Sequence, residues 1–175
     1  MTDNKAIHTI DRAVEVLTGV ATNRAVIKQE LAGLPDDDPT INKTAVEYEL
    51  QLLRIVFTGW ALAYYLTDHP QKNRMAESFW LSVHAFAGRI STLASAGTDG
   101  KTIDYFGAVR ERIQSYIDAL NTNMEEADPA DVVAAVFSRL CGGTGTRVMA
   151  DAGRKVFIDT LNTVKVYLET ISLQE

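Results

Sequence analysis

The chain has 175 residues, of which 46% are hydrophobic and 23% are charged. These proportions are ordinary for one globular domain and exclude an intrinsically disordered chain, which would be less apolar and more charged. The formal net charge of −6 disfavours nucleic acid as a partner, because nucleic-acid-binding proteins usually show a basic excess or a basic stripe.

The cellular compartment is also constrained by composition. The lone cysteine, Cys141, cannot form an intrachain disulfide, and the N-terminal residues contain no apolar stretch typical of a signal peptide. The most apolar run, residues 50–66, carries Gln51 and Arg54 near one end and is too short to span a bilayer. We therefore expect a soluble, cytoplasmic protein that does not insert into a membrane.

The first half of the chain predicts three helices. Apolar residues spaced by three, four or seven positions indicate a helix over 10–32, which the Gly33–Pro39 segment ends. A second helix is predicted over 42–67, with capping-box spacing at its start. Beyond Leu50 it is apolar on nearly every side, which is typical of a central helix or of one that faces another subunit. The third helix, over 69–96, follows Asp68 as the expected N-cap.

The second half predicts three more helices, over 102–125, 129–141 and 146–171. The start at 129 carries the strongest signal, because Asp128 can cap the helix and Pro129 fits its first position. No strand is predicted, and short connections favour antiparallel neighbours. The fold class predicted for residues 1–175 is all-α, a single domain built as an antiparallel bundle of about six helices.

A glycine-rich loop between the last two helices is a candidate anion site. Backbone N–H groups at a helix start can bind phosphate, which would involve Gly143, Gly145 and Arg147. A Walker motif, however, follows a strand and contains a lysine, and this loop does neither. A plain connection between helices is the alternative that we favour.

Five glycines inside predicted helices suggest close approach of another group. Each costs about 1 kcal/mol relative to alanine, a cost that a close helix crossing or a bound ligand could offset. They are Gly19, Gly59, Gly88, Gly107 and Gly153. Close packing is the simpler interpretation, and a ligand space between the second and third helices is the functional one.

Aromatic residues gather on the same two helices and define the candidate ligand pocket. An apolar pocket would be lined by Trp60, Tyr64, Trp80, His84 and Gly88. An aromatic core is the alternative. The Glu-x-x-His pairs that hold metals in helical bundles do not occur, so we expect no metal, no cofactor and no catalytic residues.

Two functions remain in competition. The nearly all-apolar second helix favours a non-catalytic interaction module that forms a homodimer or docks a protein partner. The alternative is a small-molecule-binding or sensor bundle with its pocket between the second and third helices. An enzyme is disfavoured, because no acid, nucleophile or metal constellation outweighs a structural interpretation.

Overall fold

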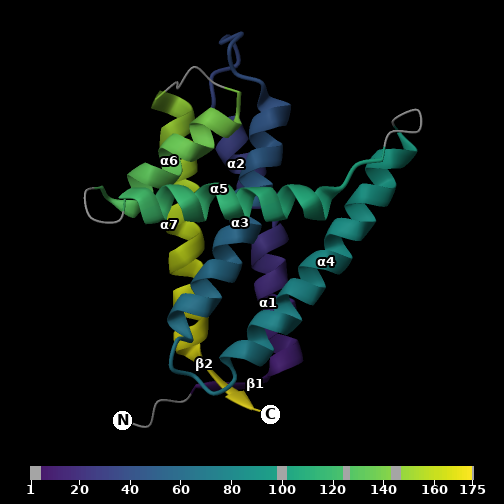
Figure 1. The fold of residues 1–175 in the computed structure, drawn as a ribbon, viewed down its shortest axis with the longest axis vertical. Helices are drawn as coiled ribbons and strands as arrows, with labels where there is room; N and C mark the ends of the chain where they lie inside the picture. Colours follow the sequence, from purple (N-terminus) through teal and green to yellow (C-terminus); the bar gives the residue numbers. More distant parts are fainter. Residues whose placement is uncertain (1–4, 98–101, 124–126, 143–146, 175) are drawn as a thin grey trace.

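The computed structural model describes residues 5–97, 102–123, 127–142 and 147–174. Within these ranges the chain forms seven helices and two short strands, which confirms the all-α class (Figure 1). The elements are β1 (Ala6–Thr9), α1 (Ile10–Thr22), α2 (Arg24–Ala32), α3 (Lys43–Tyr65), α4 (Lys72–Ala96), α5 (Tyr105–Asn123), α6 (Pro129–Leu140), α7 (Arg147–Thr170) and β2 (Ile171–Gln174).

The helix predicted over 10–32 is two helices, because the helical conformation is interrupted at Asn23. The Asn23 side chain accepts a hydrogen bond from the backbone N–H of Ala25 and so caps α2. Two side chains of α3 satisfy carbonyls at the end of α1. Gln51 donates to the Ala21 carbonyl at 2.8 Å, and Arg54 donates to the Val20 carbonyl at 2.5 Å. Side-chain hydrogen bonds from α3 therefore replace the backbone hydrogen bonds that a continuous helix would make at this point.

The strand pair was not predicted from the sequence. β1 and β2 pair in parallel, with Ala6 opposite Ile171 and Thr9 opposite Gln174. Each strand has four residues, too few for a clear alternating pattern, and its partner lies at the other end of the chain. The pair joins the two ends of the chain at one end of the molecule (Figure 1).

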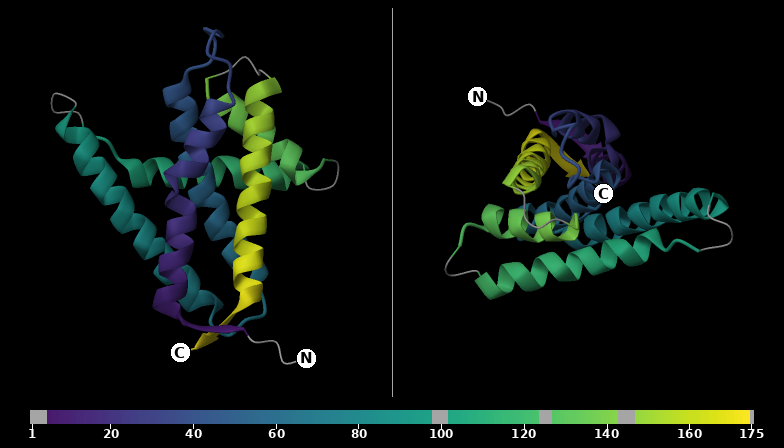
Figure 2. Two further views of the ribbon diagram at one scale, coloured as in Figure 1. Left: turned by 180° about the vertical axis from the view of Figure 1, so that it is seen from behind. Right: turned by 90° about the horizontal axis from the view of Figure 1, so that it is seen from above.

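α3 is the central helix, as one of the two interpretations of its sequence predicted. It packs against each of the other six helices, and every residue from Glu49 to Gly59 is buried. Seen from above, α1, α2 and α7 lie on one side of α3, α5 lies on the other, and α4 and α6 lie beside it (Figure 2). The middle of α3, from Glu49 to Gly59, is thus covered within one chain.

The helices do not all follow one direction. α5 lies across the long axis of the molecule, and α4 diverges from α1 and α3 toward its C-terminal end (Figures 1 and 2). The buried residues of α4 are Met75, Phe79, Val83 and Ala87, which form one narrow stripe. A large part of α4 therefore faces solvent.

The capping predictions had mixed outcomes. Asp128 caps α6 by accepting from the backbone N–H of Ala130, as predicted. Asp68 does not cap α4, because a turn over 66–72 delays the helix until Lys72. Asn42, rather than Thr44, caps α3.

No helix among the described residues is long and apolar enough to cross a membrane.

Candidate functional site

The aromatic side chains of α3 and α4 border a small hollow whose third wall is α5. A Cβ atom at Gly59 would overlap the ring of Trp80, so this glycine lets the indole pack directly on α3. The hollow measures about 190 Å³. Its lining residues are Val56, Phe57, Gly59, Trp60, Ala63, Trp80, Ile113, Tyr116, Ile117 and Leu120. We call it the aromatic hollow.

The structure brings only part of the predicted pocket together. Trp60 and Trp80 line the aromatic hollow, and Tyr64 stacks on Trp60 with ring centroids 5.0 Å apart. His84 is exposed, with its ring at the edge of Phe106, and Gly88 is exposed on the outer side of α4. Both follow a buried residue of α4 by one position, which turns them about 100° away from the core.

The outer face of α4 carries apolar residues that the core does not use. Leu81 is 64% exposed and Leu93 is 72% exposed. A Cβ atom built on Gly88 meets no other atom within 4 Å, so packing inside the chain does not explain this glycine. Leu81, Ala85, Gly88 and Thr92 are all exposed and follow one another along the helix. We call these four residues the α4 seam.

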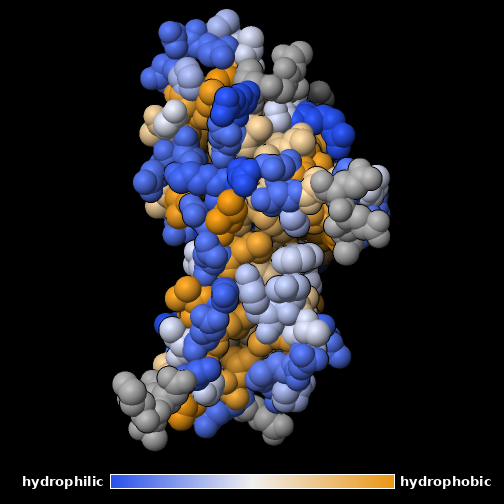
Figure 3. Space-filling model, turned by 90° about the vertical axis from the view of Figure 1, so that its left-hand side faces the viewer, coloured by the Kyte–Doolittle hydropathy of each residue, from blue (hydrophilic) through white to orange (hydrophobic). Residues whose placement is uncertain are grey.

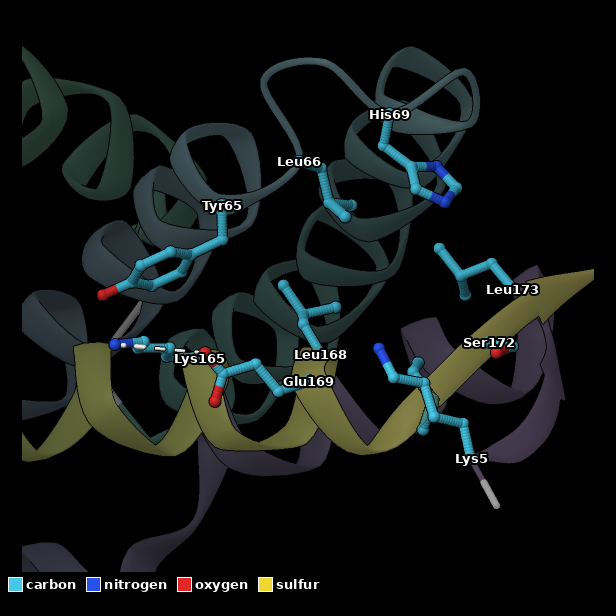
Figure 4. A pocket seen from close by; sticks show the side chains of 10 residues that line it. Lys5, Tyr65, Leu66, His69, Lys165, Leu168, Glu169, Ser172 and Leu173 are labelled. Carbon is cyan, nitrogen blue, oxygen red and sulfur yellow. Dashed lines mark ion pairs between the residues drawn. The ribbon is translucent and has the colours of Figure 1, made fainter. Parts of the chain in front are cut away.

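A more polar hollow of about 420 Å³ lies beside the strand pair. It is formed by the end of α3, the connection to α4, the end of α7 and β2, together with Lys5 (Figure 4). We call it the end pocket. Its lining residues are Lys5, Tyr65, Leu66, His69, Lys165, Leu168, Glu169, Ile171, Ser172 and Leu173. Sequence reasoning missed it, because these residues meet only after the two chain ends pair.

A buried ion pair joins α3 to α5. Arg112 donates from Nη2 to Oε1 of Glu49 at 2.6 Å and from Nε to Oε2 at 2.8 Å. The Glu49 side chain is 4% exposed. A two-point bond of this kind satisfies both oxygens of the carboxylate, so the pair serves to hold the two helices in register.

Arg54, the charged residue within the most apolar run of the chain, is buried on α3. It donates to the carbonyl of Val20, and burial lowers the pKa of its guanidinium. A cation near the end of α1 interacts favourably with the partial negative charge of the last carbonyls. Its position supports the break between α1 and α2 and explains why a charged residue occurs in the most apolar helix.

The remaining polar candidates have structural explanations. Burial raises the pKa of the Cys141 thiol to about 12, which keeps it protonated at neutral pH. In the connection between α2 and α3, Asp36 forms an ion pair with Lys43, whose hydrogen bond lowers the pKa of that carboxyl group. Among the described residues, no group of three or more His, Cys, Asp or Glu side chains could hold a metal ion.

The predicted anion site is described only at its last residue. Gly143 and Gly145 lie outside the described residues. Arg147 begins α7, and its side chain is 94% exposed and lies 3.9 Å from a carboxylate oxygen of Asp151. An exposed arginine next to a carboxylate is an ordinary surface arrangement.

The chain was compared with protein-family models, curated proteins and solved structures. None of them matches it. A functional proposal for this helical fold therefore depends on its own surfaces and cavities.

Proposed function

We propose that this protein is a self-associating interaction module in which α4 packs against α4 of a second copy. The observation that supports the proposal is the α4 seam, an exposed row of small and apolar residues on a helix that buries only its opposite stripe. α3 is a poorer candidate for this contact, because its residues from Glu49 to Gly59 are buried within the chain.

The spacing of the seam suits a helix pair. Leu81, Ala85, Gly88 and Thr92 follow one another at intervals of 4, 3 and 4 residues, close to the 3.6 residues of a helical turn, so they lie on one face of α4 along which a second helix can pack. The row is also symmetric about its midpoint. In an antiparallel twofold pair centred there, Leu81 lies opposite Thr92 and Ala85 lies opposite Gly88, as a self-complementary interface requires.

Gly88 gives separate support. A glycine in the middle of an exposed helix costs about 1 kcal/mol relative to alanine. No neighbour within the chain occupies the space above it. The close approach of a second helix, opposite Ala85, would offset this cost.

The charges beside the seam are compatible with the pairing. In the same antiparallel register, Glu77 lies opposite Ala96 and Arg89 lies opposite His84. Neither charged residue meets its own copy directly, so the twofold pair avoids juxtaposed like charges.

Sedimentation velocity of the full chain over a concentration series tests this proposal. We expect a dimer, and we expect Leu81→Glu and Gly88→Leu each to weaken dimerisation about tenfold or more, because one adds a charge to the seam and the other blocks close approach. Val166→Glu is the matched control, since Val166 on α7 is 58% exposed and outside the seam. A wild-type chain that stays monomeric, or a control that dissociates equally, would contradict the proposal.

The control residue, Val166, lies on the α7 side of the molecule. There, apolar residues reach the surface in patches down the middle of the face, between margins of polar side chains (Figure 3). Ile158 and Val166 on α7 are among the exposed large hydrophobic residues. Dispersed exposed apolar residues of this kind are common on monomeric proteins.

The second candidate function, small-molecule binding, is favoured by the aromatic hollow. Trp60 is 37% exposed there, so a ligand could reach its indole ring, which stacks on the ring of Tyr64. The chain has two tryptophans, and both line this hollow, so intrinsic fluorescence reports on it directly. A metabolite panel that leaves the fluorescence unchanged would exclude this alternative for the compounds in the panel.

A further inference from the structure

We infer that the end pocket binds a small organic anion that has an apolar tail, such as a medium-chain carboxylate. The inference concerns a different region from the α4 seam and does not depend on self-association. It is supported by the charge, the hydrogen-bond donors and the apolar wall of the pocket. Its volume of about 420 Å³ lies within the usual range of small-molecule sites.

The charge of the pocket opposes that of the whole protein. Two lysines, Lys5 and Lys165, and one carboxylate, Glu169, are the charged groups among its described lining residues. Lys165 and Glu169 are 3.9 Å apart at their nearest polar atoms, which is a loose ion pair. The pocket is therefore locally cationic on a chain with a net charge of −6, which favours an anion and disfavours a cation.

His69 adds a hydrogen-bond donor. The backbone N–H of Gln71 donates to Nδ1 of His69 at 3.1 Å. In the neutral imidazole the proton is then on Nε2, which becomes a hydrogen-bond donor. The ring extends from the α3–α4 connection toward Leu173 on β2, so it stands at one wall of the pocket (Figure 4).

The other donors lie in two places along the pocket. The Tyr65 hydroxyl and the Lys165 amino group lie together at the end away from His69, and Lys5 reaches in nearer to Ser172 and Leu173 (Figure 4). Burial raises the pKa of Tyr65, so its hydroxyl stays protonated at neutral pH and can donate. Ser172 contributes a second hydroxyl among the lining residues.

The remaining wall is apolar. Leu66 and Ile171 are buried at 7% and 6% exposure, and Leu168 and Leu173 complete the apolar lining. Lysines beside an aliphatic wall suit a ligand with two parts, a charged head and a hydrocarbon tail. A free inorganic anion would leave this wall unused, and an uncharged alcohol would gain no electrostatic attraction from the two ammonium groups.

The experiment is a titration of the full ¹⁵N-labelled chain with octanoate, acetate and 1-hexanol, followed by two-dimensional NMR. We expect octanoate to shift the amide signals of residues 65–72 and 165–173. Acetate has no tail and 1-hexanol has no charge. We expect each of them to bind at least about tenfold more weakly than octanoate. Raised salt should weaken the octanoate interaction, because the lysines are exposed.

Variants separate this site from general apolar binding. Lys165→Gln and Lys5→Gln should each weaken octanoate binding several-fold, and the double variant more than tenfold. Lys28→Gln on α2 is the matched control, an exposed lysine far from the pocket in sequence, and should bind as the wild type does. All three substitutions replace exposed side chains, so the fold is expected to persist, and circular dichroism checks this.

Three results would overturn the inference. They are an absence of octanoate binding, equal binding of 1-hexanol and octanoate, and shifts confined to the residues of the aromatic hollow. The Leu81→Glu chain should bind octanoate as the wild type does, so failure at the end pocket and failure of α4 self-association can be told apart.

Discussion

Two regions of the molecule differ in how they use a glycine in the middle of a helix. One is the packed body, which consists of α3, α5, α6 and α7, and the other is α4. A Cβ atom at Gly153 on α7 would overlap the ring of Phe137 on α6. A Cβ atom at Gly88 on α4 would meet nothing within 4 Å. The same residue type thus serves close packing in the body and has no packing role within the chain on α4.

The difference teaches how unevenly this chain uses its apolar residues. α3 is buried without a break from Glu49 to Gly59, whereas α4 is longer but buries one narrow stripe. Stability should accordingly be concentrated in the body, and α4 has a face free for contact with other molecules. Four pairs of substitutions test this contrast, each comparing a site in the body with a site on α4 or in the turn before it.

The largest difference is expected for phenylalanine truncation. Phe137→Ala removes a fully buried ring from α6 and should lower the free energy of unfolding by about 3–5 kcal/mol. Phe86→Ala removes a half-buried ring from α4 and should cost about 1–2 kcal/mol. Urea denaturation followed by circular dichroism measures both. Equal losses would show that α4 is packed as tightly as the body.

The next effect concerns arginines. Arg112→Met leaves the carboxylate of Glu49 buried without its partner and should cost about 3 kcal/mol. Arg89→Met on α4 changes an exposed side chain and should alter stability by less than about 0.5 kcal/mol. Adding Glu49→Leu to Arg112→Met should restore part of the lost stability. If it restores none, the ion pair is not the cause of the loss.

The glycine contrast predicts opposite signs. Gly153→Ala forces the new methyl group against Phe137 and should destabilise the protein by about 1–3 kcal/mol. Gly88→Ala should stabilise the monomer by up to about 1 kcal/mol through helix propensity. Thermal unfolding in a Leu81→Glu background removes any contribution from self-association. A loss of stability on Gly88→Ala would contradict the open position of this residue.

The smallest effect concerns helix caps. Asp128→Ala removes the hydrogen bond to Ala130 and should cost about 1 kcal/mol. Asp68→Ala should leave stability nearly unchanged, because Gln71 is the N-cap position of α4 and provides no side-chain cap bond. Chemical denaturation of both variants checks the difference. A comparable loss at Asp68 would place a capping role where the structure has none.

The candidate sites were less predictable from sequence than the fold was. The pattern of α3 identified Gly59, Trp60 and Trp80 as neighbours across two helices, and the structure places them together. The sequence pattern could not identify the direction in which α4 diverges from α3. This direction separates His84 and Gly88 from Gly59, Trp60 and Trp80. The end pocket gave no local signal, since Lys5 and Lys165 are neighbours only through the strand pair.

The sequence by itself determined the helical class and the apolar character of α3 on nearly every side, because hydrophobic periodicity and caps such as Asp128 act over a few residues. Only the tertiary structure decided the break at Asn23, the pairing of β1 with β2 and the free face of α4. The first depends on side chains of α3 that reach the end of α1. The others depend on which surfaces remain uncovered once the helices have packed, and this is a property of the whole chain that no local pattern contains.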